Sequence, residues 1–329
     1  MSYQCVDTYQ KIFVSSIEEI YDIIQKYKAF HNLPRKVADG EPLLDVFYRG
    51  QSDCEWGITP SLLRWNVNEA EHIQTYAPKE PLSLFETVAD IQHYHQKTRF
   101  IDFTMNPNVA IYFACSEHQD KDGAFYIYSY APHKPEWHTT VILTELVRIQ
   151  NEDEMSVEEF SQEILKHHPE LSVQFSSEKE LHGTIMSFLD HGFMVLPDSE
   201  NYGNNLRLQR QAGCFFVCGV VFPQLKISEK SLKEKSKEEL EEASKEISRA
   251  YWFSRAGKNR FKPHSVIIPD SLKIPCSDNL GKNCTAASEE GRGLVKVIIP
   301  HKIKDEFLWQ LSLKGITEEY LLPPRHLMV

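Results

Sequence analysis

The sequence predicts an α+β fold. Apolar residues recur with the period of an amphipathic helix in some segments and alternate as in a strand in others. The two kinds of segment follow one another in mixed order, without the regular β-α-β alternation that produces a doubly wound parallel sheet. The chain of 329 residues, 41% of them hydrophobic, is long enough for one large domain or two small ones with a buried core.

The first helix is predicted at residues 16–30. Ser16 is followed three residues later by Glu19, which is the capping-box pattern of a helix start. Apolar residues then recur at helical spacing, at Ile17, Ile20, Ile24 and Tyr27. Because residues 33–42 have the composition of a linker, we divide the chain into an N-terminal helical extension, residues 1–40, and a main domain, residues 41–329.

The main domain is expected to begin with strands and helices in mixed order. Asn106-Pro107 is a favourable helix start, and Asp122-Gly123 is a turn that leads into an aromatic strand. The elements predicted on this basis are strands at residues 45–48, 98–104, 124–130 and 138–146, and helices at 84–95 and 106–117.

Strand signals are sparse at residues 150–205, and we expect a helical insert there. Residues 229–249 are dense in charges of both signs, which is typical of a solvated helix. The remaining predicted elements are helices at 157–167, 178–189 and 303–313, a loop and buried strand within 206–222, and short strands at 266–268 and 294–299.

The composition limits the functions to be considered. The net charge is −11, so the chain as a whole does not attract nucleic acid, and such binding needs a local basic patch. The N-terminal residues do not resemble a secretory signal, and the most apolar stretch, residues 214–222, is too short to span a membrane. Seven cysteines without a framework spacing suggest reduced thiols. We therefore expect a cytoplasmic protein with no membrane contact.

The first candidate site is Phe47-Tyr48-Arg49-Gly50-Gln51, at the end of a predicted strand. The guanidinium of an arginine makes two parallel bonds to a phosphate, and a neighbouring glycine lets the anion approach the backbone. The alternative interpretation is an arginine paired with a carboxylate at the edge of the core.

The second candidate site runs from Gln92-His93 through Thr98 to Pro107. The polar residues Arg99, Asp102 and Thr104 lie in a strand-like segment that leads into a helix capped by Asn106. Junctions of this kind present polar atoms and free N–H groups to ligands. The alternative is an internal Arg99–Asp102 ion pair, with Thr104 as a turn residue.

Two further segments are candidates. Arg207-Leu208-Gln209-Arg210-Gln211 precedes a buried strand, where a solvated loop is the alternative. Basic and aromatic side chains, including Arg255, Lys258 and Arg260, interleave in residues 251–262, which is the pattern of a nucleic-acid contact, and an exposed basic loop is the alternative. Cys214 and Cys218 have no second pair at metal-ligand spacing, so we expect no metal site.

Together these segments resemble the FRG domain family, whose name comes from the aromatic-Arg-Gly motif seen here at residues 47–51. The other similar segments are Gln92-His93, Thr98–Pro107, Ala110–Ala114, Asp122–Ala124, Gln211–Phe215 and Leu311–Pro323. The resemblance spans about residues 45–325. One difference is Tyr94–Lys97, where the family usually has a smaller turn that contains glycine.

A second resemblance is to ADP-ribosyltransferases of the Arg–Ser–Glu type. Arg49 on a strand, Asp102–Thr104 before the Asn106–Ala114 helix, and Gln209–Gln211 before a buried strand are similar to the three elements of these enzymes. Gln211 stands where they carry a catalytic glutamate. The implied fold is an ADP-ribosyltransferase-like core of small antiparallel or mixed sheets flanked by helices, with helical insertions.

The two resemblances imply an enzyme that uses NAD as a substrate, without a metal, and modifies a nucleic-acid base or a protein. The expected catalytic residues are Asp102, Gln211 and His93. The expected NAD-binding residues are Arg49, Gly50, Gln51, Arg99, Thr104 and Asn106, and the expected acceptor-binding residues are Gln209, Arg255, Lys258 and Arg260. A bacterial toxin or phage-defence effector, with a separate antitoxin or regulatory chain, would fit this activity. The alternatives are a non-catalytic module that binds nucleotide or nucleic acid, and an NAD glycohydrolase.

Overall fold

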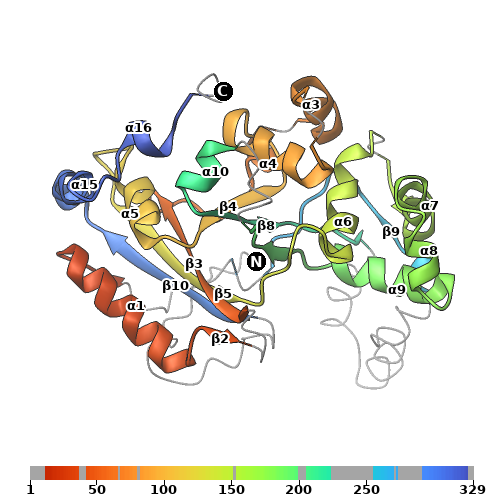
Figure 1. Ribbon diagram of the computed structural model, residues 1–329, viewed down its shortest axis with the longest axis horizontal. Coiled ribbons are helices and arrows are strands. Elements are labelled where there is room, and N and C mark those ends of the chain that lie inside the picture. The colour runs from red at the N-terminus through yellow and green to blue at the C-terminus, as the bar shows by residue number, and fades with distance from the viewer. Residues whose placement is uncertain are drawn as a thin grey trace, which may run out of the picture.

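The computed structural model describes residues 12–36, 42–65, 67–79, 82–150, 153–198, 205–223, 255–269, 272 and 291–324 (Figure 1). Its centre is a mixed, mainly antiparallel sheet, which confirms the α+β prediction. The strands follow the order β1 (Ile12–Phe13), β10 (Gly291–Ile299), β5 (Gly123–Tyr130), β3 (Pro42–Gln51), β4 (Phe100–Thr104), β8 (Gly213–Val217) and β7 (Phe193–Val195), with β2 (Arg35–Lys36) beside β3. Only β1 and β10 pair in parallel among these strands.

The sheet consists of two blocks that meet at a single residue pair. In one block, β3 pairs with β5 from Asp45–Tyr130 to Gln51–Ala124. In the other, β4 pairs with β8 along its whole length. Between the blocks, β3 and β4 are joined only at Tyr48 and Thr104. The two strands therefore separate from this pair onward, as β3 continues along β5 and the rest of β4 lies along β8.

Helices cover the sheet and extend beyond one end of it. They are α1 (Ile17–His31), α2 (Ser61–Trp65), α3 (Glu69–Tyr76), α4 (Leu84–Tyr94), α5 (Pro107–Cys115), α6 (His138–Glu145), α7 (Val157–His167), α8 (Leu171–Gln174), α9 (Glu178–Leu189), α10 (Leu206–Arg210), α15 (Lys304–Ser312) and α16 (Glu318–Leu321). Short 3-10 turns are η1 (Leu146–Arg148), η2 (Ala256–Lys258) and η4 (His301–Ile303), and a small second sheet pairs β6 (Met155–Ser156) with β9 (Arg260–Phe261). Helices α7, α8 and α9 form a group at the right of Figure 1, whereas α1, α5 and α15 lie at the left.

The predicted helix starts are confirmed at atomic detail. The Ser16 side chain accepts from the backbone N–H of Glu19 at the start of α1. Ser83 and Glu86 form a reciprocal capping box at the start of α4. Asn106 caps α5, with Pro107 in its first turn. These bonds satisfy backbone donors that the helices leave without an internal partner.

Two main cores lie on the two blocks. Apolar residues of α1, β3, α5, β10 and α15 pack together in one core. The N-terminal helix α1 therefore packs against the main sheet and shares its core. Apolar residues of α4, α6, α7 and α9 pack against β4, β7 and β8 in the other. The predicted insert at 150–205 contains α7, α8 and α9, and it also supplies β7, the edge strand beside β8.

Several predictions of secondary structure are wrong. The segment predicted as a strand at 138–146 instead forms helix α6 (His138–Glu145) and the start of η1, because burial among α4, α9 and β8 outweighs the β-branched composition of Thr139-Thr140-Val141-Ile142. Residues 206–210 form helix α10, capped by Asn205, where we expected a loop. Ile267 makes an isolated bridge with Gly219 in place of the strand predicted at 266–268.

The other differences concern boundaries. The strand predicted at 45–48 extends through Gln51 as β3, so the aromatic-Arg-Gly motif lies within the sheet. The charged helix predicted at 229–249 lies outside the described residues. Within the described ranges, no helix has both the length and the apolarity needed to cross a membrane.

Gly50 has a packing role in this fold. A Cβ atom at this position would lie 1.8 Å from the carbonyl oxygen of Ala110 and 2.6 Å from the backbone N of Ala114. Both atoms belong to α5, so strand β3 approaches this helix more closely than any side chain allows. Gly50 was predicted to let a ligand approach the backbone. In the structure, the absence of a side chain at Gly50 lets helix α5 pack closely against β3.

We predict that Gly50→Ala lowers the free energy of unfolding by at least about 1–3 kcal/mol, because α5 must shift away from β3. Chemical denaturation would measure this change. Gly57→Ala is the matched control, since a Cβ atom there meets nothing within 4 Å, and it should change stability by less than about 1 kcal/mol. Equal stability of the two variants would contradict the close packing of β3 on α5.

Candidate functional site

A cleft of about 420 Å³ opens where β3 and β4 separate. Its walls come from β3, α2, α4, β4, α5, α10 and α16, which are far apart in the sequence. Its volume falls within the range of about 300–1,000 Å³ that is usual for small-molecule sites. Seven of the predicted site residues line it, namely Arg49, Gly50, Gln51, His93, Asp102, Thr104 and Gln211.

Arg49 spans the gap between the two strands. Its Nη1 donates to the backbone carbonyl oxygen of Asp102 at 2.6 Å. Its Nε is buried and has no partner within the described residues. Burial lowers the pKa of the guanidinium, and the Asp102 carboxylate opposes that effect. Since an arginine remains protonated over the whole physiological range, the cleft contains a fixed cation whose hydrogen-bonding capacity is only partly used.

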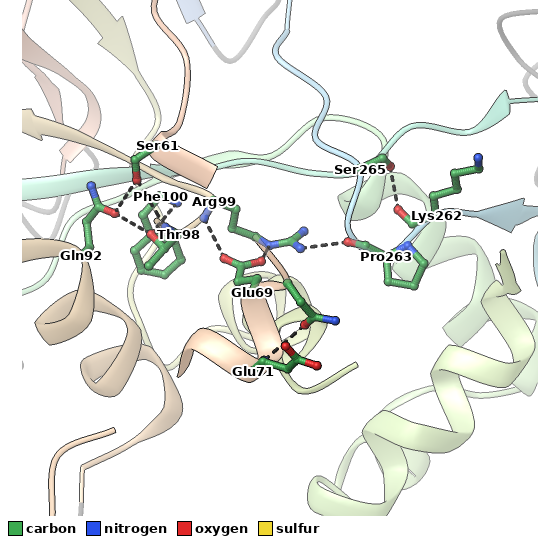
Figure 2. A network of polar contacts seen from close by, with 11 residues as sticks. Ser61, Glu69, Glu71, Gln92, Thr98, Arg99, Phe100, Lys262, Pro263 and Ser265 are labelled. Carbon is green, nitrogen blue, oxygen red and sulfur yellow. Dashed lines mark hydrogen bonds and ion pairs between the residues drawn. The ribbon is translucent and has the colours of Figure 1, made fainter. Parts of the chain in front are cut away.

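The carboxylate of Asp102 is held on one side and open on the other. Its Oδ2 accepts from Nε2 of Gln92 at 2.8 Å, while its Oδ1 is buried with no partner in the described part of the chain. The amide of Gln92 is fixed in turn, because its Oε1 accepts from Oγ1 of Thr98 at 2.6 Å and lies 3.5 Å from Oγ of Ser61 (Figure 2). Gln92 therefore orients Asp102.

His93 lies beside the same carboxylate. Its Nε2 is buried and has no hydrogen-bond partner among the described residues. Burial lowers the pKa of the imidazole; Asp102 opposes this shift, and Arg207 adds to it. The ring packs against Phe215, with 5.4 Å between the ring centroids. A neutral imidazole near neutral pH follows from these surroundings.

Gln51 completes a group of four open polar atoms. Its Nε2 donates to the carbonyl of Gly57 at 3.2 Å, whereas its Oε1 is buried without a described partner. Four residues that line the cleft thus each carry a buried polar atom with no described partner: a donor at Arg49, acceptors at Gln51 and Asp102, and the imidazole nitrogen of His93. Buried polar atoms in folded proteins are nearly always hydrogen-bonded, so their concentration in one cleft points to a polar ligand.

Three other predicted site residues have their side chains engaged by the protein. Oγ1 of Thr104 donates to the carbonyl of Gln211 at 2.5 Å and accepts from the N–H of Asn106 at 2.9 Å. Nε2 of Gln211 donates to the carbonyl of Leu321 at 3.0 Å. Oδ1 of Asn106 accepts from the N–H of Asn108 and caps α5. These contacts position β4, α5, α10 and α16. The ligand-binding roles of Thr104 and Asn106 and the catalytic role of Gln211 stay predictions.

Helix α10 holds the C-terminal helix α16 against the cleft. Nε of Arg207 donates to the carbonyl of Pro323 at 3.0 Å, and Nη1 of Arg210 donates to that of Tyr320 at 3.0 Å. Helix α16 and the residue after it contribute Glu318 and Leu322 to the lining. Gln209, expected to bind the acceptor, does not line the cleft. The sequence analysis did not identify Glu318, although it placed the Leu311–Pro323 segment in the family pattern.

Other residues that line the cleft lie in or near the predicted motifs but were not predicted as site residues. Gln92 belongs to the Gln92-His93 motif, but no role was predicted for it. In the structure its amide contacts Ser61 and Thr98. Glu117, just after α5, also lines the cleft. The sequence Gln-His at the end of a helix does not indicate which of the two side chains contacts a carboxylate. Only the structure shows that it is the glutamine.

The predicted role of Arg99 in binding NAD is wrong. Arg99 is fully buried, and its Nε forms an ion pair with Oε2 of Glu69 at 2.7 Å (Figure 2). Its Nη2 donates to the carbonyl of Pro263 at 2.9 Å. The alternative that we considered, a pair with Asp102, is also wrong, because Asp102 faces Gln92. Arg99 links α3, the start of β4 and the 255–269 segment.

The predicted basic patch does not reach the cleft. Arg255, Lys258 and Arg260 lie on or next to η2 and β9, whose neighbours are α7 and α9. Arg260 donates to the carbonyl of Glu154 and lies 3.6 Å from the carboxylate of Glu159. None of the three lines the cleft. Residues 251–254 lie outside the described residues.

These observations define an α+β domain with a polar, ligand-sized cleft at the junction of two sheet blocks. The model of the FRG domain family matches residues 45–123, which confirms the resemblance to this family over that segment. The match runs from β3 to the start of β5 and includes Arg49, His93 and Asp102, whereas our prediction extended it to residue 325. No curated protein and no solved structure matches the chain.

We predict that Glu69→Ala lowers the free energy of unfolding by about 3–5 kcal/mol, because it leaves the Arg99 guanidinium buried without its counter-charge. Urea denaturation followed by fluorescence would measure this loss. Glu71→Ala, which removes an exposed carboxylate from the same helix, should cost less than about 1 kcal/mol. Similar losses for both variants would contradict a buried ion pair.

The His93 environment predicts a pH dependence of stability. Because the folded state lowers the pKa of His93 below the ordinary value of about 6.5, the unfolded chain binds more protons than the folded chain on acidification. The free energy of unfolding should therefore fall as the pH drops below about 6.5. His93→Gln should make this fall shallower. Part of it should remain, since burial also lowers the pKa of His133, to about 4. An unchanged slope in His93→Gln would contradict a neutral, buried His93.

Proposed function

We propose that the cleft binds NAD and that the protein is an ADP-ribosyltransferase-like enzyme that modifies a macromolecule. The observation that carries the proposal is the pairing of opposite charges across the cleft. The Arg49 cation and the Asp102 carboxylate face one hollow, and each has a buried hydrogen-bonding atom that no described residue engages.

The arginine suits the pyrophosphate of NAD. A guanidinium makes short, charge-assisted bonds to phosphate oxygens, and Nε of Arg49 is available for one of them. A fixed cation at this place neutralises phosphate charge without a metal. Oε1 of Gln51 lies two residues further along β3 and offers an acceptor to a ribose hydroxyl or to the nicotinamide amide.

The carboxylate suits the charge that the reaction develops. When the bond between nicotinamide and C1′ of the ribose breaks, its electron pair leaves with nicotinamide and positive charge builds up on the ribose. An oriented anion stabilises that charge. Asp102 lines the cleft, is held in position by Gln92 and keeps Oδ1 without a described partner. In the transferases that the sequence resembles, a glutamate stands at the place of Gln211. Here Asp102 takes the electrostatic role.

The second half of the reaction needs a base. A nucleophile of the acceptor forms the new bond to C1′ and loses its proton. His93 is the candidate to receive this proton, since its neutral imidazole has an open Nε2. Glu117 and Glu318 are further carboxylates in the lining, on the α5 and α16 sides of the cleft.

We extend the proposal to the cell. Uncontrolled consumption of NAD and modification of macromolecules would harm the cell that contains the enzyme. Such a protein fits a toxin or phage-defence effector of the bacterial cytoplasm, restrained by a separate antitoxin or regulatory chain.

One observation favours a second candidate, a non-catalytic module that binds a nucleotide in the same cleft. Gln211 carries no charge, and its amide is committed to the carbonyl of Leu321, so the position of the usual catalytic glutamate is occupied by a structural residue. An NAD glycohydrolase is a third outcome, since hydrolysis uses the same cleft with water as the acceptor.

The experiment that separates these functions incubates the purified protein with labelled NAD and a mixture of protein and nucleic acid. Free nicotinamide together with a labelled polymer means transferase, whereas nicotinamide with free ADP-ribose means glycohydrolase. Intact NAD with measurable affinity means a binding module. If the protein neither binds nor cleaves NAD, the proposal is refuted.

We predict that Arg49→Ala and Asp102→Asn each reduce NAD turnover by about 10²–10³-fold, because each removes one charge that the reaction uses. Asp102→Asn also preserves the size of the side chain. Matched controls are Arg255→Ala and Asp120→Asn, which alter exposed residues that do not line the cleft, and these should retain turnover. Circular dichroism should show native spectra for all four variants. Wild-type turnover by Arg49→Ala or Asp102→Asn would refute the site.

A further inference from the structure

The turn between α4 and β4 holds two residues in an unusual conformation. Gln96 and Lys97 have φ angles of 56° and 65°, the left-handed region that favours glycine. The backbone here has the geometry that glycine supplies, but it carries two long polar side chains. Strain of this kind is found where the side chains have a function.

The backbone of this turn is fixed by neighbouring residues. The carbonyl of Gln96 lies 2.9 Å from Nε2 of His72, and the N–H of Lys97 donates to Oγ of Ser61 at 2.7 Å. With the main chain held in this way, the two side chains occupy set positions. Gln96 lines the cleft together with Arg64, and Nζ of Lys97 lies 5.6 Å from the ring centroid of Trp65.

Helix α2 contributes the rest of this surface. Trp65 is 59% exposed, which is unusual for the largest apolar side chain, and Arg64 beside it is exposed as well. Arg64 and Gln96 connect the surface directly to the interior of the cleft. An exposed aromatic ring, with Arg64 next to it in sequence and Lys97 next to it in space, thus adjoins two residues that line the cleft, in a chain whose net charge is −11.

We propose that Arg64, Trp65, Gln96 and Lys97 form an acceptor rim, and that the acceptor they receive is a single-stranded nucleic acid. The proposal rests on the proposed function and names its acceptor. An exposed tryptophan stacks on any base, and two cations neutralise flanking phosphates, which is how proteins hold single strands. A base stacked on Trp65 places the neighbouring nucleotide at the mouth of the cleft. The acceptor contact thus lies on α2 and the 94–97 turn, and not at residues 255–262.

The first test measures the affinity of the full-length protein for labelled DNA and RNA single strands of about 12 nucleotides, by fluorescence anisotropy without NAD. Trp65→Ala should weaken binding by about tenfold or more. Arg64→Ala with Lys97→Ala should lower the slope of log affinity against log salt by about 1.4, since each phosphate contact on a single strand contributes about 0.7. Trp309→Ala and Lys302→Ala are the matched controls, because they alter an exposed tryptophan and lysine on α15 and η4 that do not line the cleft.

The second test uses the conformation of the turn. Lys97→Gly relieves the left-handed strain, so the variant should unfold at a temperature no lower than that of the wild type while binding the strand less tightly. A lower unfolding temperature would contradict the strained turn. Wild-type affinity in Trp65→Ala and in the double variant would overturn the nucleic-acid rim, as would labelling of protein alone in the NAD assay. Strand binding that depends on the rim, in a protein that leaves NAD intact, would support the rim and refute the proposed enzyme.

Discussion

The site depends on the separation of two antiparallel strands. β3 and β4 share one residue pair, Tyr48 and Thr104, and each then pairs with a different neighbour. Two strands that stayed paired would use their backbone groups on each other and leave no hollow. Here the carbonyl of Asp102 lacks a strand partner on the β3 side and instead accepts from the Arg49 guanidinium. Asp102 therefore has two roles: its backbone carbonyl positions the Arg49 cation, and its side chain supplies the opposing carboxylate.

The walls around this opening are held in place by contacts within the protein. Strand β3 lies against α5 at a distance that only Gly50 permits. Nζ of the buried Lys304 donates to the carbonyls of Ser52, Glu117 and His118, so it ties the residue after β3 to the chain that follows α5. Its burial lowers the pKa of the amine. Since the three carbonyls satisfy its three donors, this lysine fixes the cleft wall without entering it.

Local signals in the sequence predicted part of this arrangement. Helices with a side-chain cap, such as α1 after Ser16 and α4 after Ser83, begin close to the predicted residues, because capping is a short-range interaction that neighbouring residues determine. Helix α6 was mistaken for a strand because its helical state is imposed by packing against distant elements and it has no side-chain cap. The same distinction applies to the site. Arg49 and Asp102 were identified from motifs, whereas the partner of Arg99 is thirty positions away, at Glu69, and no local pattern reveals it.

Resemblance to a family and geometry give different information about the same residues. Thr104 and Gln211 were predicted as site residues from their place in the motifs, yet the hydroxyl of Thr104 donates to the carbonyl of Gln211 and the amide of Gln211 donates to that of Leu321. The atoms left open belong instead to Arg49, Gln51, His93 and Asp102. Chemistry requires atoms that remain available after folding, so the second group carries the functional argument. Because Gln92 binds one oxygen of Asp102 and leaves the other without a described partner, the network that stabilises the fold also fixes the orientation of this carboxylate.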